Sequence, residues 1–587
     1  MKRFLWLGFV LFLYVICTGC GDTFRPIIIP NPPIFPNPKA AHTVVAINGD
    51  EIDDNGTLVP MPGSAMAIDV SGDTDASVAD VGLAPIHAVQ QTANQVLVVN
   101  QAVTGLNVPT TSCSVAIPPT PPNHTFNVCS SITKLSFSGT EIVTNPPPAT
   151  ITLPPYSGAN FVAVAPTDTL AYVTLPTYPP DPTQPLTIVP SVGVVNTQSN
   201  NLVATIPLSN NPAANPVALA VTPDKSKLYV ANEGLDSISG FNTVDRTPRQ
   251  GSPMSTSSPP IWLVARTDNQ RVYVLEQTSG VLAEIDTTST AGPDTLTEYP
   301  STYSVPGATT MIYDSNLNRL YIPGGPVMKI VDISQTPAQV LATVSIPTVP
   351  GVPAVAANAV AVAALPDGSR VYVASVPSAA QTSQVSISGI LGDGVTATYT
   401  YTLTGGHDLT TGLTVVVSGI ASPNDVFNGT FVVDSVSNSV PGTTCDQTNA
   451  ICTFQTANTN QVAQTAVTGV ASSTIDNLFP QISVVNVSSN SVTKTIGIPG
   501  FPDATDPSNL AYYAPVCAST PFRYMMAAGG DSSRAYLASC DGGNVNIIDT
   551  SNDTYIENLA APIGSRPPIP PSPLNPPQNP VFLFAGP

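Results

Sequence analysis

The sequence repeats one phrase: an apolar run, a polar turn, and a short run of β-formers around a tyrosine. The clearest copy, at residues 216–234, reads P-V-A-L-A-V-T-P-D-K-S-K-L-Y-V-A-N-E-G. Pro223 presets φ for the turn, and Asp224 can accept bonds from backbone amides two residues on. The run around Tyr229 suits a half-buried pleated surface. The phrase therefore predicts a β-hairpin.

The second strand of this hairpin can be aligned seven times along the chain. The aligned runs are residues 95–99, 170–173, 227–230, 271–274, 319–322, 370–373 and 534–537. An apolar run precedes each one, and two further strand-like runs follow, such as residues 191–196 and 201–206. From Tyr172 the tyrosines fall at 229, 273, 321 and 372. Repeats of about 40 to 50 residues with four strands each are typical of propeller blades.

These repeats predict an all-β fold, a β-propeller with seven blades preferred and eight as the alternative. Strand-like runs at residues 65–70 and 76–81 have no hairpin of their own. We expect them to complete the blade that begins near Arg523, which would remove open sheet edges. Residues 544–549 and 554–559 compete for that place. If both sets are used, residues 42–47 would help to form an eighth blade.

A long gap interrupts the repeat, because Tyr536 follows Tyr372 by 164 residues. From about Ser386 the sequence changes to alternating Thr, Val and Tyr, which predicts a small, β-sandwich-like antiparallel module inserted at residues 386–470. The propeller then occupies residues 41–385 and 471–562. Residues 563–587 are expected to be a Pro-rich C-terminal tail, whose last apolar run can pack back onto the body.

The composition fits many short strands joined by turns, with 63 Pro, 40 Gly and only 10% charged residues. Apolar residues make up 42% of the chain, which is enough to bury a core and argues against disorder. The formal net charge is −20, and there is no run of Lys or Arg. A protein of this kind repels phosphate backbones, so nucleic-acid binding is not expected.

The N-terminus has the pattern of an export signal, with Lys2 and Arg3 before an apolar stretch at residues 4–16 that is too short to span a bilayer. Residues 16–20, I-C-T-G-C, resemble a bacterial lipobox, although Cys17 stands where that motif usually has Leu. The resemblance implies that residues 1–19 are removed and that Cys20 is lipidated. An ordinary cleaved signal peptide is the alternative.

Residues 20–40 are a Pro-rich stretch that we expect to be an extended tether between membrane and body. Several acyl chains on Cys20 would give a lasting membrane anchor. Gly21 follows the cysteine, which favours the outer membrane or cell surface, with the periplasmic side as a further possibility.

Six cysteines remain when Cys17 is removed and Cys20 is lipidated. They form three sequence-local pairs: Cys113 with Cys129, Cys445 with Cys452, and Cys517 with Cys540. Local pairing is the simplest of the 15 possible arrangements, and disulfides fit an oxidising compartment. Metal binding is not expected, because no C-x-x-C motif or histidine cluster accompanies these thiols.

Two copies of the phrase resemble the YVTN family of β-propellers, which occurs in prokaryotic surface-layer and exported proteins. They are V-T-P-D-K-S-K-L-Y-V-A-N at residues 221–232 and L-P-D-G-S-R-V-Y-V-A-S at residues 365–375. I-I-D-T at residues 547–550 resembles the family's third strand. The resemblance extends over about residues 65–560, apart from the insertion. It implies a propeller blade and no particular reaction.

No catalytic residue, cofactor or metal site is predicted. The isolated histidines, expected in strands or loops, are His42, His87, His124 and His407. Three inner-strand residues, Arg266, Asp314 and Arg523, are candidates for a lactonase-like site but are better explained as strand-end turn residues. The acidic run at residues 48–56 lacks the EF-hand spacing and is expected to be a solvated loop.

These features favour a membrane-anchored exported lipoprotein whose propeller is a binding or scaffold module for an unidentified protein or glycan. A lactonase-like hydrolase that uses the mouth of the propeller channel is one alternative. A surface-layer or adhesion component is another. The repeated phrase does not choose among them, because a fold does not determine a function.

Overall fold

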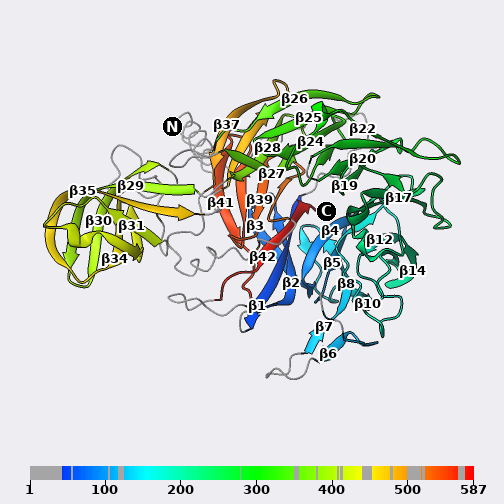
Figure 1. Ribbon diagram of the computed structural model, residues 1–587, viewed down its shortest axis with the longest axis horizontal. Coiled ribbons are helices and arrows are strands. Elements are labelled where there is room, and N and C mark those ends of the chain that lie inside the picture. Colours follow the sequence, from blue (N-terminus) through cyan, green and yellow to red (C-terminus); the bar gives the residue numbers. More distant parts are fainter. Residues whose placement is uncertain are drawn as a thin grey trace, which may run out of the picture. The chain divides into compact units, whose positions relative to one another are not determined.

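The computed structural model describes residues 42–586, except for 55–56, 104–105, 107, 117–124, 278, 349–355, 379–380, 406–408, 410–413, 439–451, 476–479, 499–516, 518–521 and 566–574. The predicted signal peptide, Cys20 and the tether therefore lie outside the described residues. The described part of the chain is all-β and forms eight four-stranded antiparallel blades, together with a separate seven-stranded sheet (Figure 1). No helix within it is long and apolar enough to cross a membrane.

The strands of each blade are given from the innermost to the outermost. Blade 1 contains β4 (Pro85–Thr92), β5 (Gln95–Asn100), β8 (Cys129–Ser138) and β10 (Ala149–Pro155). Blade 2 contains β11 (Val162–Val164), β12 (Leu170–Leu175), β13 (Ser191–Asn196) and β14 (Asn201–Pro207). Blade 3 contains β15 (Pro216–Val221), β16 (Lys227–Asn232), β17 (Ser237–Asn242) and β18 (Met254–Ser255). Blade 4 contains β19 (Pro260–Ala265), β20 (Arg271–Glu276), β21 (Leu282–Asp286) and β22 (Thr295–Glu298).

The remaining blades follow the same order. Blade 5 contains β23 (Ile312–Asp314), β24 (Arg319–Gly324), β25 (Val327–Asp332) and β26 (Gln339–Ser345). Blade 6 contains β27 (Ala357–Ala364), β28 (Arg370–Pro377), β36 (Gln481–Asn486) and β37 (Ser491–Gly497). Blade 7 contains β38 (Tyr524–Ala528), β39 (Arg534–Ser539), β40 (Asn544–Asp549) and β41 (Thr554–Ala560). Blade 8 contains β42 (Asn579–Ala585), β1 (Thr43–Asp54), β2 (Thr57–Asp69) and β3 (Thr74–Leu83).

Short elements lie between the blade strands. The strand β9 (Glu141–Ile142) pairs with β8, and β6 (Ser114–Ala116) pairs with β7 (Thr125–Asn127). The 3₁₀ turns are η1 (Pro212–Ala214), η2 (Glu233–Leu235), η3 (Ser301–Tyr303) and η4 (Asp425–Phe427). The long helices that the composition disfavours do not occur in the described residues.

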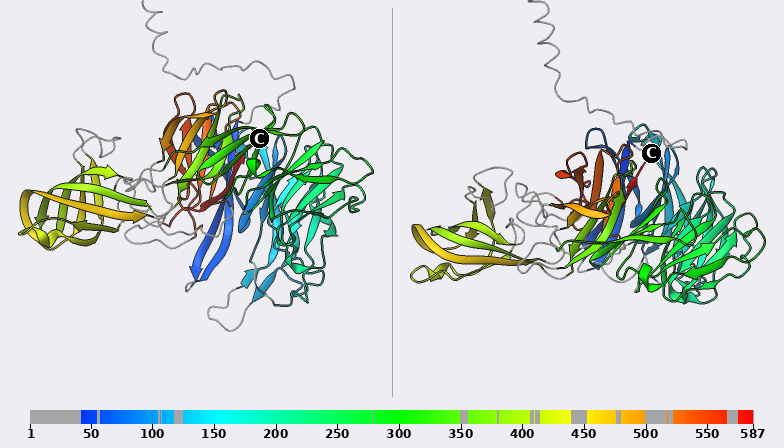
Figure 2. Two further views of the ribbon diagram at one scale, coloured as in Figure 1. Left: turned by 45° about the horizontal axis from the view of Figure 1, so that its top comes forward. Right: turned by 90° about the horizontal axis from the view of Figure 1, so that it is seen from above.

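Blade 8 closes the ring by joining the two ends of the chain. The C-terminal strand β42 pairs antiparallel with β1, with Val45 opposite Phe584 and Ile47 opposite Phe582. Figure 2 shows this red strand beside the blue strands of the N-terminal end. The innermost strand β42 also contacts β38 of blade 7 and β4 of blade 1. Both free edges of the blade array are therefore covered.

The structure of blade 8 corrects four sequence expectations. The blade number is eight, the alternative, and not the preferred seven. The runs at residues 65–70 and 76–81 belong to β2 and β3 of blade 8 and do not complete the blade near Arg523, because β40 and β41 already complete it. The expected C-terminal tail contains β42, whose apolar residues are largely buried at the ring's centre. The acidic run expected as a loop instead lies largely in β1, where Asp50 is buried and accepts the Ser565 N–H at 2.9 Å.

The repeated hairpin forms the two inner strands of blades 1 to 7, as the opening phrase predicts. In blade 3, Ala220 lies opposite Tyr229 across the β15–β16 pair. The tyrosine at this position is at most 1% exposed in six blades: Tyr172, Tyr229, Tyr273, Tyr321, Tyr372 and Tyr536. Packing of such large rings stabilises each blade against its neighbours.

A basic residue at the start of the second strand reaches the next blade in four places. We call this contact the inter-blade clasp, and its acceptor lies in the turn between the third and fourth strands of that next blade. Lys227 Nζ donates to the Ser289 carbonyl at 2.6 Å. Arg370 Nη1 contacts Asp553 at 2.7 Å, and Arg534 Nε contacts Asp73 at 2.8 Å. The weakest clasp joins Arg319 Nη1 to the Val487 carbonyl at 3.5 Å.

Two predicted disulfides are present. Cys113 and Cys129 lie with their Cα atoms 5.0 Å apart, and Cys517 and Cys540 with theirs 6.0 Å apart. Cys452 is disulfide-bonded, and Cys445, its predicted partner, lies outside the described residues. The pairing of Cys445 with Cys452 stays a prediction.

The inserted module is one seven-stranded sheet and not a sandwich of two. Its strands are β29 (Gln381–Asp393), β30 (Thr396–Gly405), β31 (Thr414–Ser418), β32 (Gly429–Val432), β33 (Ser435–Asn438), β34 (Cys452–Ala457) and β35 (Gln461–Ile475). The sheet is curled, and β32 approaches β34. Tyr399 and Phe454 stack at 4.6 Å in its own core. The chain enters and leaves the module between β28 and β36 of blade 6, so the insertion occupies a loop between paired strands.

Removal of residues 579–587 should open the ring. The deletion leaves the edge of β1 unpaired, uncovers the parts of β4 and β38 that pack on β42, and removes the buried Phe582. We therefore expect a loss of stability of at least about 3–5 kcal/mol and a tendency to aggregate. Thermal unfolding and size-exclusion chromatography measure both effects. The control is Ala585→Ser, an exposed position on the same strand, which should leave both unchanged. A truncated protein as stable as the full chain would contradict the closure.

Candidate functional site

The centre of the propeller is filled by aromatic rings from five blades. We call His87, Phe161, Trp262, Phe522 and Phe582 the aromatic plug. His87 stacks on Phe161 with ring centroids 3.8 Å apart and lies 4.5 Å from Phe582. Trp262 meets Phe161 and Phe522 edge to face, each at 5.7 Å. Eight inner strands leave a gap on the axis, and large rings fill such a gap with favourable contacts.

His87 is part of this packing. Its Nδ1 accepts the Val162 N–H at 3.4 Å, and burial lowers the pKa of the imidazole to about 3. The ring is therefore neutral at physiological pH. Among the described residues, no group of three or more His, Cys, Asp or Glu side chains is placed to hold a metal ion. His42 is exposed beside β1, and His124 and His407 lie outside the described residues.

A pocket of about 220 Å³ adjoins the plug at blades 5, 6 and 7. We call it the channel-mouth pocket. Its polar lining residues are Thr309, Thr310, Asn358, Arg523 and Tyr524, and its other lining residues are Val360, Val376, Phe522 and Met525. Asn358 and Val360 lie on the inner strand β27, and Tyr524 and Met525 on the inner strand β38. The pocket therefore forms where inner strands of neighbouring blades begin.

Arg523 is held in the pocket wall by an ion pair. Its Nε donates to Asp541 Oδ2, and the Cys517 N–H donates to Asp541 Oδ1 at 3.2 Å. The Asp541 side chain is fully buried, and the Arg523 side chain is 25% exposed. The disulfide links Cys517, whose N–H donates to Asp541, to Cys540, the residue before Asp541. The guanidinium is therefore fixed by its neighbours and still in contact with the pocket.

The other two sequence candidates are turn residues. Arg266 donates to Asp268 at 2.8 Å and to the Ile333 carbonyl of blade 5 at 2.7 Å, so it ties a hairpin turn to the next blade. Asp314 accepts the Asn316 and Leu317 N–H groups at 2.9 and 3.1 Å. Burial raises the pKa of Asp314. Neither residue lines the channel-mouth pocket.

The sequence did not single out Asp541, Thr309, Thr310 or Asn358. Thr309 and Thr310 precede β23, Asn358 lies on β27 and Asp541 follows β39, and none belongs to a short motif. The only available signal was that Arg523 stands at the start of an inner strand. A single sequence does not show which residues of other blades converge there.

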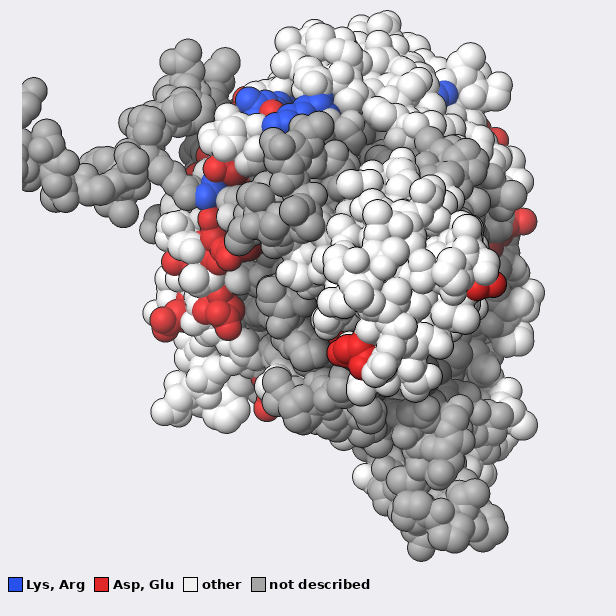
Figure 3. Space-filling view, turned by 90° about the vertical axis from the view of Figure 1, so that its left-hand side faces the viewer, with Lys and Arg blue, Asp and Glu red and all other residues white. Residues whose placement is uncertain are grey.

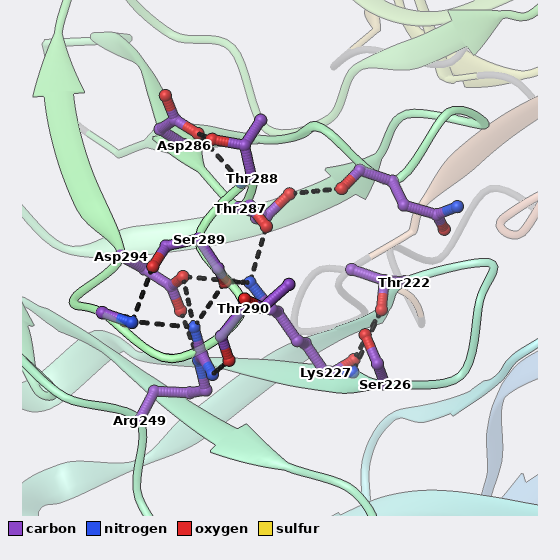
Figure 4. Close-up of polar contacts among 12 residues, drawn as sticks. Thr222, Ser226, Lys227, Arg249, Asp286, Thr287, Thr288, Ser289, Thr290 and Asp294 are labelled. Atoms are coloured by element: carbon purple, nitrogen blue, oxygen red, sulfur yellow. Dashed lines mark hydrogen bonds and ion pairs between the residues drawn. The ribbon is translucent and has the colours of Figure 1, made fainter.

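The buried charge cluster at Asp294 is a second place where polar groups gather (Figure 4). Arg249 makes two bonds of 2.9 Å to this carboxylate, and Tyr229 and Lys227 add bonds of 2.9 and 3.1 Å. Lys227 and Arg249 also donate to carbonyls in residues 287–292. The Asp294 side chain is 2% exposed. This cluster joins blades 3 and 4 and is closed to a ligand.

Few cations are available on the surface. The basic residues less than 9% exposed are Lys227, Arg249, Arg266, Lys329 and Arg534. The sequence has no Lys or Arg between Arg370 and Lys494, a stretch that includes the module. Figure 3 shows a face on which uncharged side chains predominate. Five of the basic residues in the described part of the chain are therefore buried within the fold.

A scan against protein-family models and a search of curated proteins found no match. Membership of the YVTN family therefore stays a prediction. Among solved structures, apo AztD from Citrobacter koseri is similar at a TM-score of 0.43 and 8% identity, over 92% of this chain and 97% of that chain. The periplasmic gluconolactonase PpgL of Pseudomonas aeruginosa is similar at 0.36 and 11%, over 61% and 92%. The Dos1 propeller is similar at 0.34 and 10%, over 54% and 72%.

We expect Asp294→Asn to destabilise the protein by about 3–5 kcal/mol at neutral pH, because it leaves Lys227 and Arg249 buried without their carboxylate. Urea denaturation at pH 7 measures this loss. The matched control is Asp75→Asn, at an exposed position, with an expected change within about 0.5 kcal/mol.

The loss should depend on pH. Burial acts to raise the pKa of Asp294, but hydrogen bonds from Arg249, Tyr229 and Lys227 outweigh it, so the pKa lies below its usual value. The carboxylate therefore stabilises the fold above the unfolded pKa of about 3.9, and this stabilisation declines as pH falls towards the folded value. The difference between wild type and variant should shrink below about pH 4. If Asp294→Asn lowered the free energy of unfolding by the same amount at pH 7 and below about pH 4, this assignment would be contradicted.

Proposed function

We propose that this protein is an exported, lipid-anchored binding protein whose β-propeller holds a ligand in the channel-mouth pocket. The ligand would be either a group of a partner protein or a unit of a glycan. The observation that carries the proposal is the pocket itself. It combines a fixed guanidinium, two hydroxyls and an amide with an aromatic ring and aliphatic side chains. Sites of this kind, mostly apolar with a few placed polar groups, are typical of small-molecule binding.

The chemistry of the lining favours binding over hydrolysis. Among the described residues, the pocket lining includes no carboxylate and no imidazole. General acid–base catalysis most often uses such a group within hydrogen-bond reach of the substrate, and burial raises the pKa of Tyr524, the phenol in the lining, above its usual value. His87 is stacked in the plug with its pKa lowered to about 3, and Asp541 is engaged by Arg523 and Cys517. We therefore propose binding, and no observation favours the lactonase-like alternative or the surface-layer alternative.

Export and lipidation are supported by the N-terminal pattern and the disulfides. Cys20 ends a lipobox-like sequence after a short apolar stretch. Two disulfides, Cys113–Cys129 and Cys517–Cys540, fit an oxidising compartment. The anchor would place the protein on the outer membrane or cell surface and keep a bound ligand near the cell.

The anchor is tested by Cys20→Ser in the full chain. The wild type should fractionate with membranes and incorporate a labelled fatty acid, and the variant should lose the label and become soluble, because the acyl chains supply the membrane affinity. Cys17→Ser is the matched control and should remain lipidated. A labelled Cys20→Ser variant would contradict the assignment.

The pocket is tested by Val360→Phe, which places a ring in its space. We expect the full chain carrying Cys20→Ser to bind members of a panel of monosaccharides and small organic acids, measured by saturation-transfer NMR, and the added Val360→Phe to abolish that binding. Val203→Phe, at a position 41% exposed on β14, is the control and should bind as before. Binding that survives Val360→Phe would place the ligand elsewhere.

A further inference from the structure

We propose that the channel-mouth pocket binds the acetamido group of an N-acetylated amino sugar, with the sugar ring at the pocket's opening. The amide of that group bonds to the side chains of Thr310 and Asn358, and its methyl group packs on the apolar lining. No hydrogen bond from Arg523 is required. This inference rests on the proposed function and narrows the ligand to one chemical class.

Three neutral polar side chains of the lining are open to a ligand. Thr309, Thr310 and Asn358 line the pocket, and within the described part of the chain their side chains have no hydrogen-bond partner. Thr310 is only 7% exposed, so the pocket is the space from which a partner can reach its hydroxyl. A largely buried polar group without a partner costs free energy, which a ligand that bonds to it can offset.

A secondary amide suits these side chains. In its trans form the carbonyl and the N–H point from opposite edges of the amide plane, so it needs a donor on one side and an acceptor on the other. Thr310 precedes β23 of blade 5, and Asn358 lies on β27 of blade 6, so polar groups reach the pocket from two neighbouring blades. A hydroxyl and a carboxamide can each donate and accept, so both edges of a ligand amide can be satisfied.

The lining offers a ligand no unbalanced charge. Arg523 is the only charged side chain in the described lining, and it forms an ion pair with Asp541, whose side chain is fully buried. A carboxylate or an ammonium group in the pocket would have no further opposite charge to balance it, and a desolvated charge without a partner is costly. The net charge of −20 adds long-range repulsion of an anion. The group that enters the pocket is therefore neutral.

The rest of the lining suits a methyl group beside the amide. Val360, Val376 and Met525 present aliphatic and thioether groups, and Phe522 presents a ring. The pocket volume of about 220 Å³ is below the roughly 300 to 1,000 Å³ of clefts that enclose a drug-sized ligand. The pocket therefore encloses one terminal group and leaves the sugar ring at its opening.

An amino sugar supplies such a group better than a peptide does. An internal peptide group has chain on both sides, which a pocket for one terminal group does not admit. A peptide terminus carries a charge that the described lining does not balance. An acetamido group is neutral and terminal and ends in a methyl group. The proposed anchor would hold the pocket at a cell surface, where glycans are exposed.

The experiment compares matched methyl glycosides on the full chain carrying Cys20→Ser. The glycoside of N-acetylglucosamine carries the acetamido group, that of glucose has a hydroxyl in its place, and that of glucosamine has an ammonium group. We expect the N-acetyl compound to bind at least about tenfold more tightly than either of the others, because it adds two neutral hydrogen bonds and a buried methyl group. Isothermal titration calorimetry measures the affinities, and saturation-transfer NMR should show the strongest transfer at the acetyl methyl protons.

Substitutions assign the contacts. Asn358→Leu and Thr310→Val should each weaken binding of the N-acetyl compound by about three- to tenfold, because each removes one neutral hydrogen bond. Thr495→Val, the same change at an exposed position of β37, is the control and should leave binding unchanged. Thermal unfolding of each variant separates a lost contact from a lost fold. Unchanged affinity in both pocket variants would overturn the assignment.

The outcomes separate the two proposals. Probe binding that is lost in Val360→Phe but equal for the N-acetyl compound and the glucoside would overturn the acetamido assignment and leave the pocket as a binding site. Tighter binding of N-acetylalanine methylamide than of the N-acetyl glycoside would assign the acetyl group to a peptide and overturn the sugar. The absence of any Val360-dependent binding at millimolar probe would overturn both.

Discussion

The propeller depends on the inter-blade clasp, which joins one blade to the next. A blade presents its third–fourth strand turn to its neighbour, and that turn has carbonyl groups that need donors. Lys227 and Arg370 supply them across the blade boundary, and Arg534 donates instead to the Asp73 carboxylate of the next blade. All three basic residues stand two residues before a buried tyrosine. In two of the four clasps the tyrosine hydroxyl also bonds to an acidic side chain that the basic residue contacts, as Tyr229 does at Asp294 and Tyr372 at Asp553. The basic residue and the tyrosine of the repeated phrase are therefore one structural unit.

This use of charge explains an unusual composition. Only 18 Lys and Arg residues occur in 587, and the fold commits many of them to contacts between blades. Their removal from water costs free energy, which hydrogen bonds to carboxylates and carbonyls must offset. Among the described basic residues, only Arg246 and Lys494 are exposed. An arginine that lines a pocket, as Arg523 does, is therefore an exception within this chain.

The repeated phrase was sufficient to predict the hairpins, the four-stranded unit and the insertion, and the cysteine positions were sufficient for two disulfides, because each depends on local sequence. It was not sufficient for the blade count. Blade 8 lacks the phrase, because its two inner strands, β42 and β1, are not connected by a hairpin turn. Ile47 pairs with Phe582, although the two residues lie near opposite ends of the sequence. The site was less predictable still. Arg523 was one candidate among three, and nothing near it in sequence indicated Asn358 or Thr310, which only the ring brings to the same pocket.

The closed ring also explains why the pocket lies where it does. Blade hairpins must keep the buried tyrosine and its neighbours, so their sequences vary little in type. The starts of the inner strands are freer, because they face the axis and need only fill it. Blades 1, 2, 4, 7 and 8 fill it with the aromatic plug, whereas blades 5 and 6 place Thr310, Asn358 and Val360 there. The smaller side chains leave the space that the large rings would occupy. The pocket is thus a consequence of unequal filling of one axis, and the specificity of the proposed binding site would depend on the few residues at which the blades differ.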